Sequence, residues 1–146
     1  MTILKHMSPF SRYFYQLRMN YGLRQVELAE LVGYDQTYVS ALENGTKGPP
    51  TPEFIERLIR ALSISESEQT ELYEVVEASQ RKLIIPSDVS EAVYWLLLDL
   101  KRNLTTLHPA EIDLIRGIMQ LDQKKTRMEP MLAHKIRRRT KGEVKM

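Results

Sequence analysis

The chain has 146 residues, 42% hydrophobic and 27% charged, which is typical of one compact domain or of a small domain with an appendage. It contains no cysteine, which excludes a disulfide framework, a thiolate zinc site and a cysteine nucleophile. Its three histidines (His6, His108 and His134) stand in no metal-ligand spacing, and no apolar run has the length of a membrane span or a signal peptide. We therefore expect a cytoplasmic protein that has no metal and no cofactor.

The net charge of +2 is the sum of three segments that differ in sign. Residues 1–63 carry seven basic and six acidic side chains, residues 64–123 carry five and eleven, and residues 124–146 carry nine and two. The chain is thus near-neutral, then acidic, then basic. This asymmetry indicates separate roles for the three parts.

The apolar periodicity is helical throughout, with no long alternation of the kind that strands show. Serine, threonine and aspartate side chains predict the helix starts, and Gly22, Gly33 and Gly45 predict three of the ends. Seven helices are expected, over residues 9–21, 25–32, 36–43, 52–62, 66–83, 88–104 and 109–123.

Two of these helices, over residues 25–32 and 36–43, meet through the tight turn Gly33-Tyr34-Asp35, which is typical of a helix-turn-helix motif. We expect its apolar seam to comprise Val26, Ala29, Val32, Val39 and Leu42. The second helix then presents a polar outer face made of Gln36, Thr37, Ser40 and Ala41. Short uncharged side chains of this kind suit contact with base edges in a major groove.

The run Gln25 to Gly33 (QVELAELVG), followed by Asp35 to Gly45 (DQTYVSALENG), resembles the phage repressor and Cro family, also called the XRE family. The resemblance covers residues 8–63. It implies that the helix over residues 36–43 reads the major groove of double-stranded DNA.

The resemblance also implies roles for single residues. Base contacts are implied for Gln36, Thr37 and Ala41, with Ser40 added from the same outer face. Contacts to the DNA backbone are expected from Arg24, Gln25, Tyr38, Asn44 and Lys47. Gln25 is implied to brace Gln36, and Arg18 and Glu43 to form a buried ion pair.

Two of these positions leave alternatives open. Arg24 stands where the family often has a capping serine, threonine or asparagine. It cannot cap the helix but can reach a phosphate, while Glu27 can still accept the free amide of the first turn. Tyr38 fits either the core or a phosphate contact.

The helix over residues 88–104 is apolar on nearly all sides and must therefore be buried. A small helical core within residues 64–123 could bury this helix, but the three helices of that segment provide little internal volume for it. We therefore favour a homodimer interface, formed by Val93, Trp95, Leu96, Leu97, Leu100 and Leu104.

These features predict an all-α fold, with an N-terminal five-helix repressor-like helix-turn-helix domain followed by a helical C-terminal dimerisation region. We expect a DNA-binding domain over residues 1–63, a dimerisation or regulatory region over 64–123 and a basic tail over 124–146. The tail could be a solvated end, grip the DNA backbone or dock on the acidic middle segment, and we favour docking.

The expected function is a homodimeric repressor that binds an inverted-repeat operator. We expect no enzyme, because the sequence has no nucleophile–base pair and no clustered carboxylates. Two alternatives from other classes stay open: an antitoxin that masks a toxin and represses its own promoter, and an adaptor that uses the same fold to bridge proteins.

Overall fold

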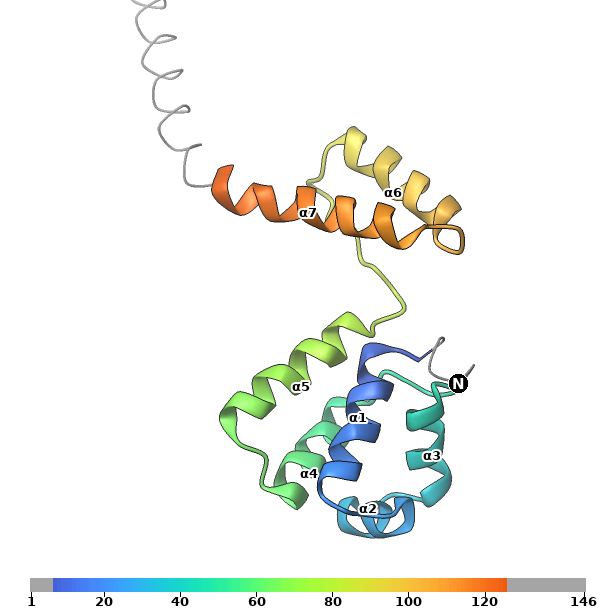
Figure 1. Cartoon of the computed structure of the whole chain (residues 1–146), viewed down its shortest axis with the longest axis vertical. Coiled ribbons are helices and arrows are strands. Elements are labelled where there is room, and N and C mark those ends of the chain that lie inside the picture. The colour runs from blue at the N-terminus through green and yellow to red at the C-terminus, as the bar shows by residue number, and fades with distance from the viewer. Residues whose placement is uncertain (1–6, 126–146) are drawn as a thin grey trace, which may run out of the picture. The chain divides into compact units, whose positions relative to one another are not determined.

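Seven α-helices make up most of residues 7–125, the part of the chain that this computed structural model describes (Figure 1). They are α1 (Pro9–Asn20), α2 (Gln25–Val32), α3 (Gln36–Asn44), α4 (Pro52–Leu62), α5 (Glu66–Ala78), α6 (Glu91–Asn103) and α7 (Pro109–Lys125). No strand occurs in these residues. The predicted all-α fold is confirmed.

Side-chain caps set the starts of several helices. The Ser8 hydroxyl accepts a hydrogen bond from the Ser11 amide at 3.1 Å, Thr51 accepts one from Phe54 at 3.3 Å, and Pro9 and Pro52 follow these two caps. A cap satisfies an amide that has no partner within its helix, and proline at the first position has no amide to satisfy. These starts agree with the sequence prediction.

The chain divides into two compact units, the first ending at Ile84 and the second beginning at Ile85. The first unit therefore extends past the boundary expected at residue 63. The reason is that α5 packs on α1: Leu72 is fully buried in the same core as Phe10 and Phe14. Residues 1–63 hold only four helices, and α5 completes the five-helix unit.

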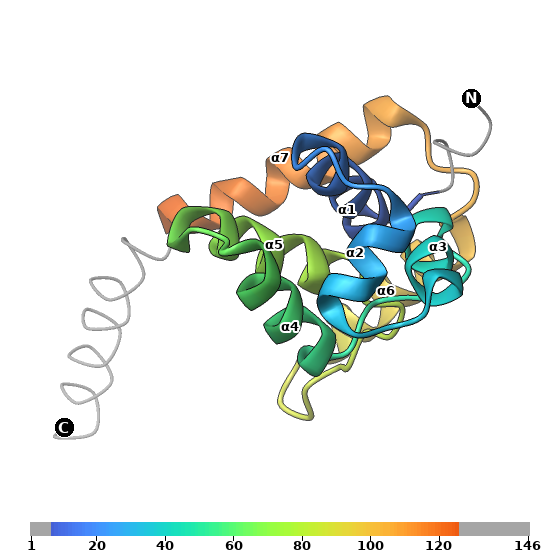
Figure 2. The ribbon, with the colours of Figure 1, turned by 90° about the horizontal axis from the view of Figure 1, so that it is seen from below.

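The core of the first unit is formed by one face of each helix from α1 to α5 together with Ile64. α1 lies between α5 and α3 (Figures 1 and 2). Four members of the expected seam are buried, but Val26 is 47% exposed, which corrects its predicted place. Leu28 is buried instead, because Leu28, Ala29 and Val32 form the inward face of α2.

α5 is shorter than expected and ends at Ala78 rather than near residue 83. Ser79 stops it: the Ser79 hydroxyl donates to the carbonyl of Val75 at 2.5 Å and accepts from the Phe10 amide at 2.8 Å. Phe10 begins α1, so this serine joins the end of α5 to the start of α1. That contact spans 69 residues of sequence.

The second unit contains α6 and α7, joined by a short loop into a helical hairpin (Figure 1). α6 begins three residues later than expected and has no fully buried residue. Among the six side chains expected at a dimer interface, Val93, Leu97 and Leu100 are half-buried within this unit. The other three are exposed: Trp95, Leu96 and Leu104.

No helix among residues 7–125 is long and apolar enough to cross a membrane. The basic tail expected over residues 124–146 lies almost entirely outside the described residues, and so does any docking of that tail.

Candidate nucleic-acid interface

The turn between α2 and α3 fixes the direction of the candidate recognition helix. Gly33 has a φ of +74°, a conformation that favours glycine, and a Cβ at this position would lie 3.2 Å from the Arg57 guanidinium. Val39 and Leu42 are buried on the inner side of α3. The outer side is therefore left free, with Gln36 and Thr37 exposed.

The four predicted base-contacting residues share this outer side but differ in access. Gln36 and Thr37 stand in the first turn of α3 and are exposed, whereas Ser40 and Ala41, one turn later, are half-buried. The start of α3 is thus its most accessible end. In helix-turn-helix complexes the N-terminal residues of the recognition helix contact base edges.

The predicted pair of Arg18 and Glu43 forms a buried ion pair. Their side chains are only 11% and 7% exposed, and the guanidinium donates both to the carboxylate and, at 2.8 Å, to the carbonyl of Leu23. Removing one partner would leave the other charge buried and unpaired, which costs about 3–5 kcal/mol. The pair therefore fixes α1 against the end of α3.

Gln25 extends this pair to the start of the recognition helix. Its amide nitrogen donates to the Glu43 carboxylate at 2.7 Å, and its amide oxygen lies 3.5 Å from the amide nitrogen of Gln36. The latter contact is the brace that the resemblance implies. A continuous polar chain thus runs from a buried arginine to the first exposed side chain of α3.

Tyr38 belongs chiefly to an aromatic cluster. Its ring stacks on Tyr34 at a centroid distance of 5.1 Å and meets the ring of Phe54 edge-on at 5.4 Å. Burial raises the pKa of the Tyr38 hydroxyl above its ordinary value. The Lys47 ammonium lies 5.7 Å from the same ring centre, in cation–π range, so Tyr38 positions a cation close to α3.

Arg24 begins α2 without capping it. Its guanidinium donates to Glu27 at 2.6 Å, and both side chains are well exposed. The hydrogen bond from Arg24 lowers the pKa of Glu27, and the same contact raises the pKa of Arg24. The Arg24 guanidinium is thus already bonded to the Glu27 carboxylate. To contact a DNA phosphate, Arg24 would have to break this bond.

Asn44 closes the other end of α3. Its side-chain oxygen accepts a hydrogen bond from the Thr46 amide at 2.9 Å and another from the Thr46 hydroxyl. Gly45 ends the helix with a φ of +81°. The NH2 group is the only donor of the Asn44 side chain, so a side-chain contact to a phosphate would have to use it.

Arg81 is a cation beside this loop that the sequence analysis did not single out. It follows α5, is exposed, and donates to the carbonyl of Gly45 at 3.1 Å across 36 residues of sequence. A cation at a helix C-terminus offsets the partial negative charge of the last carbonyls. No local pattern could have indicated Arg81, because only the packing of α5 on α1 brings it there.

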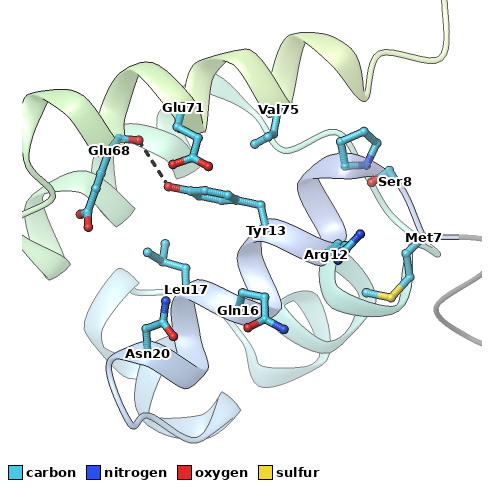
Figure 3. A pocket seen from close by; sticks show the side chains of 11 residues that line it. Met7, Ser8, Arg12, Tyr13, Gln16, Leu17, Asn20, Glu68, Glu71 and Val75 are labelled. Carbon is cyan, nitrogen blue, oxygen red and sulfur yellow. Dashed lines mark hydrogen bonds between the residues drawn. The ribbon is translucent and has the colours of Figure 1, made fainter. Parts of the chain in front are cut away.

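A cleft of about 630 Å³ lies between α1 and α5 (Figure 3). The Tyr13 hydroxyl spans it and donates to the carbonyl of Glu68 at 3.3 Å. Burial, followed by the nearby carboxylates of Glu71 and Glu68, raises the pKa of Tyr13. The cleft holds neither the predicted base-contacting nor the predicted backbone-contacting residues. Among residues 7–125 no cluster of His, Asp and Glu could hold a metal ion.

Comparison with known proteins identifies the class. Residues 9–72 match the family described as a helix-turn-helix domain. This match covers α1 to α4 and most of α5, and it makes the first unit a helix-turn-helix domain of the phage repressor and Cro (XRE) type, as the sequence resemblance implies. The match concerns the first unit, which thus carries a DNA-binding helix-turn-helix domain of the kind found in transcription regulators.

Among solved structures, the chain is similar to one described as a SinR protein/SinI protein complex. The two share 23% sequence identity, the alignment covers 67% of this chain and 99% of that chain, and the TM-score is 0.36. No curated protein sequence matches the chain.

Proposed function

We propose that the protein is a homodimeric repressor that inserts the start of α3 into the major groove of an inverted-repeat operator. The observation that carries the proposal is the polar chain from Arg18 through Glu43 and Gln25 to Gln36. It places one exposed amide side chain, that of Gln36, beside the Glu43-bonded Gln25 at the accessible end of α3. A glutamine amide can form two hydrogen bonds with one adenine, donating to its N7 and accepting from its N6 amino group.

In this proposal Gln36 reads an adenine, and Thr37, Ser40 and Ala41 contact neighbouring base edges. The residues around α3 contact the DNA backbone: Arg24, Gln25, Tyr38, Asn44, Lys47 and Arg81. Phosphate contacts fix the register of the protein on the duplex, and base contacts supply the specificity. The homodimer, assigned to exposed and half-buried apolar residues of α6, brings two copies of α3 to the two half-sites.

Substitution of Gln36 by alanine tests the proposed reading directly. The full chain is first used to select sites from a random DNA pool, and each position of the best site is then varied in competition titrations. Gln36→Ala should weaken binding by about 1–3 kcal/mol and relax the preference at one base pair per half-site.

The matched control is Glu30→Ala, an exposed change on α2 away from the predicted contacts. It should leave the preference unchanged at every position. If Gln36→Ala weakened all sequences equally, the assignment of Gln36 to a base would be wrong. If the full chain selected no site, a protein-bridging role would replace the repressor.

A further inference from the structure

The cleft between α1 and α5 holds none of the proposed DNA contacts and has the size of a small-molecule site. Its volume of about 630 Å³ falls within the range of roughly 300–1,000 Å³ that is usual for ligand pockets. The half-buried Tyr13 lies across it, and Leu17 and Val75 add apolar surface beside the tyrosine (Figure 3). The cleft therefore offers an apolar surface on which a small organic molecule can bury its own apolar part.

The two sides of the cleft carry different polar groups (Figure 3). The α1 side bears Arg12, Gln16 and Asn20, which are spaced four residues apart and therefore lie in one row along the helix. The α5 side bears Glu68 and Glu71, which are spaced three residues apart. One side thus presents a cation and two amides, and the other side presents two carboxylates.

The opposite charges on the two sides are not paired with each other. Arg12, Glu68 and Glu71 form no ion pair within residues 7–125, and all three side chains are exposed. Burial, and then the carboxylates of Glu71 and Glu68, raise the pKa of Tyr13, so both carboxylates lie near the tyrosine hydroxyl. Opposite charges that line one cleft without contacting each other leave space for a molecule that carries both charges.

We propose that this cleft binds a free amino acid with an apolar side chain. The ammonium group of the ligand donates to the carboxylates of Glu68 and Glu71, and its carboxylate accepts hydrogen bonds from the Arg12 guanidinium. The side chain of the ligand packs against Tyr13 and Leu17. Hydrogen bonds between charged groups are about twice as strong as neutral ones, so the two charged ends supply much of the affinity.

The mixture of charges favours a zwitterion over a simple ion. A simple amine would place its positive charge in the same cleft as the Arg12 guanidinium, and a simple carboxylate would lie in the same cleft as Glu68 and Glu71. Like charges at such short range repel each other. A zwitterion satisfies both sides at once. A ligand as small as an amino acid should bind with a dissociation constant on the order of 0.1–1 mM.

Titration of the full chain with amino acids, followed through its backbone amide NMR signals, tests the site. The probes are leucine, methionine and phenylalanine, and serine is the polar comparison. At least one of the three apolar probes should shift the signals of α1 and α5 residues around Tyr13 and Glu71 until they saturate. Serine should bind at least about tenfold more weakly, because it cannot cover the apolar surface of the cleft.

Two derivatives of the tightest probe test the two charged ends separately. The amide derivative keeps the ammonium group and lacks the carboxylate, whereas the N-acetyl derivative keeps the carboxylate and lacks the ammonium group. Each should bind at least about tenfold more weakly than the free amino acid, because it loses one set of charged hydrogen bonds. A derivative that binds as tightly as the free amino acid would overturn the assignment to a zwitterion.

Two variants remove one charge from each side of the cleft. Arg12→Gln and Glu71→Gln should each weaken binding of the tightest probe by about five- to tenfold. Arg60→Gln and Glu74→Gln are the matched controls, because these side chains are exposed on α4 and α5 and do not line the cleft. The controls should leave binding unchanged. The dispersion of the amide signals shows that each variant keeps its fold.

The inference has clear negative outcomes. It would be overturned if no probe gave saturable shifts, or if the shifts were centred outside α1 and α5. Equal weakening by the variants and their controls would also overturn it, because it would show a general effect of charge. These titrations contain no DNA, so their failure would leave the proposed function intact, and site selection from a DNA pool tests that function separately.

Discussion

At the scale of single residues, the central feature is that a buried charge positions an exposed reading group. Glu43 accepts hydrogen bonds from Arg18 and Gln25 at once, and Gln25 lies against Gln36. The side chains of Arg18 and Glu43 are both nearly enclosed, so water could not replace the carboxylate as a hydrogen-bond partner of Arg18 if Glu43 were removed. Stability and DNA reading should therefore depend on the same residue.

Glu43→Ala is expected to lower the free energy of unfolding by about 3–5 kcal/mol, because it leaves the Arg18 guanidinium buried and unpaired. Urea titration of the full chain measures the change. Glu53→Ala is the matched control, since it removes an exposed ion pair with Arg57 and should cost less than about 1 kcal/mol. If the two variants lost similar amounts of unfolding free energy, the buried Arg18–Glu43 pair would contribute no more to stability than an exposed pair.

The sequence predicted much at this scale and missed one contact entirely. The ion pair and the glutamine brace were implied by residues at the spacing of a known motif, because that motif fixes how α1, α2 and α3 meet. Whether Tyr38 packs in the core or contacts a phosphate could not be predicted, because its packing depends on Phe54 in α4, which is distant in sequence. Arg81 was missed because nothing local connects it with Gly45.

At the scale of elements, α3 is held at both ends by other parts of the first unit. The Ser11 hydroxyl of α1 donates to the carbonyl of Leu42 at 2.7 Å, and Arg81 donates to that of Gly45. These bonds satisfy carbonyls at the end of α3 that have no partner within the helix. The segment after α5 is therefore attached to the recognition helix.

Arg81→Ala should weaken binding to all DNA sequences by a similar factor and lower the log–log salt slope by about 0.9, the loss of one phosphate contact. Titrations at four or more salt concentrations give the slope. Lys82→Ala removes the neighbouring cation, for which no bond to the unit is found, and should leave the slope nearly unchanged. Equal salt slopes for Arg81→Ala and the natural chain would show that Arg81 does not contact a phosphate and only stabilises the end of α3.

Helix starts were predictable from the sequence, and one helix end and the domain boundary were not. Caps such as Ser8 and Thr51 act within four residues, so their patterns are visible locally. The end of α5 depends on Ser79 bonding to Phe10, and its place in the first unit depends on Leu72 entering a core built mainly by other helices. Such long-range packing leaves no local signature.

At the scale of the whole molecule, the two units divide the proposed work, with DNA reading in the first and self-association in the second. A shortened chain ending at residue 84 should fold, because it retains the complete first core, including Leu72 and Ser79. It should be monomeric and bind the operator about 10²–10⁴ times more weakly than the full chain, because it loses the second, linked half-site contact.

Sedimentation and operator titration of this shortened chain provide the measurement, and a cooperative thermal transition shows that it is folded. A chain ending at residue 63 would not serve, since it lacks α5. If the shortened chain bound as tightly as the full chain, dimerisation through the second unit would have no part in operator recognition.

The most direct test of the central claim is the selection of bound sites from a random DNA pool by the full chain. We predict an inverted repeat whose half-site centres lie about 34–36 Å apart, or a multiple of that distance. Each half-site should contain an adenine whose preference disappears with Gln36→Ala. A single unrepeated site, or a pool in which no sequence is enriched, would contradict a dimer that reads DNA through α3.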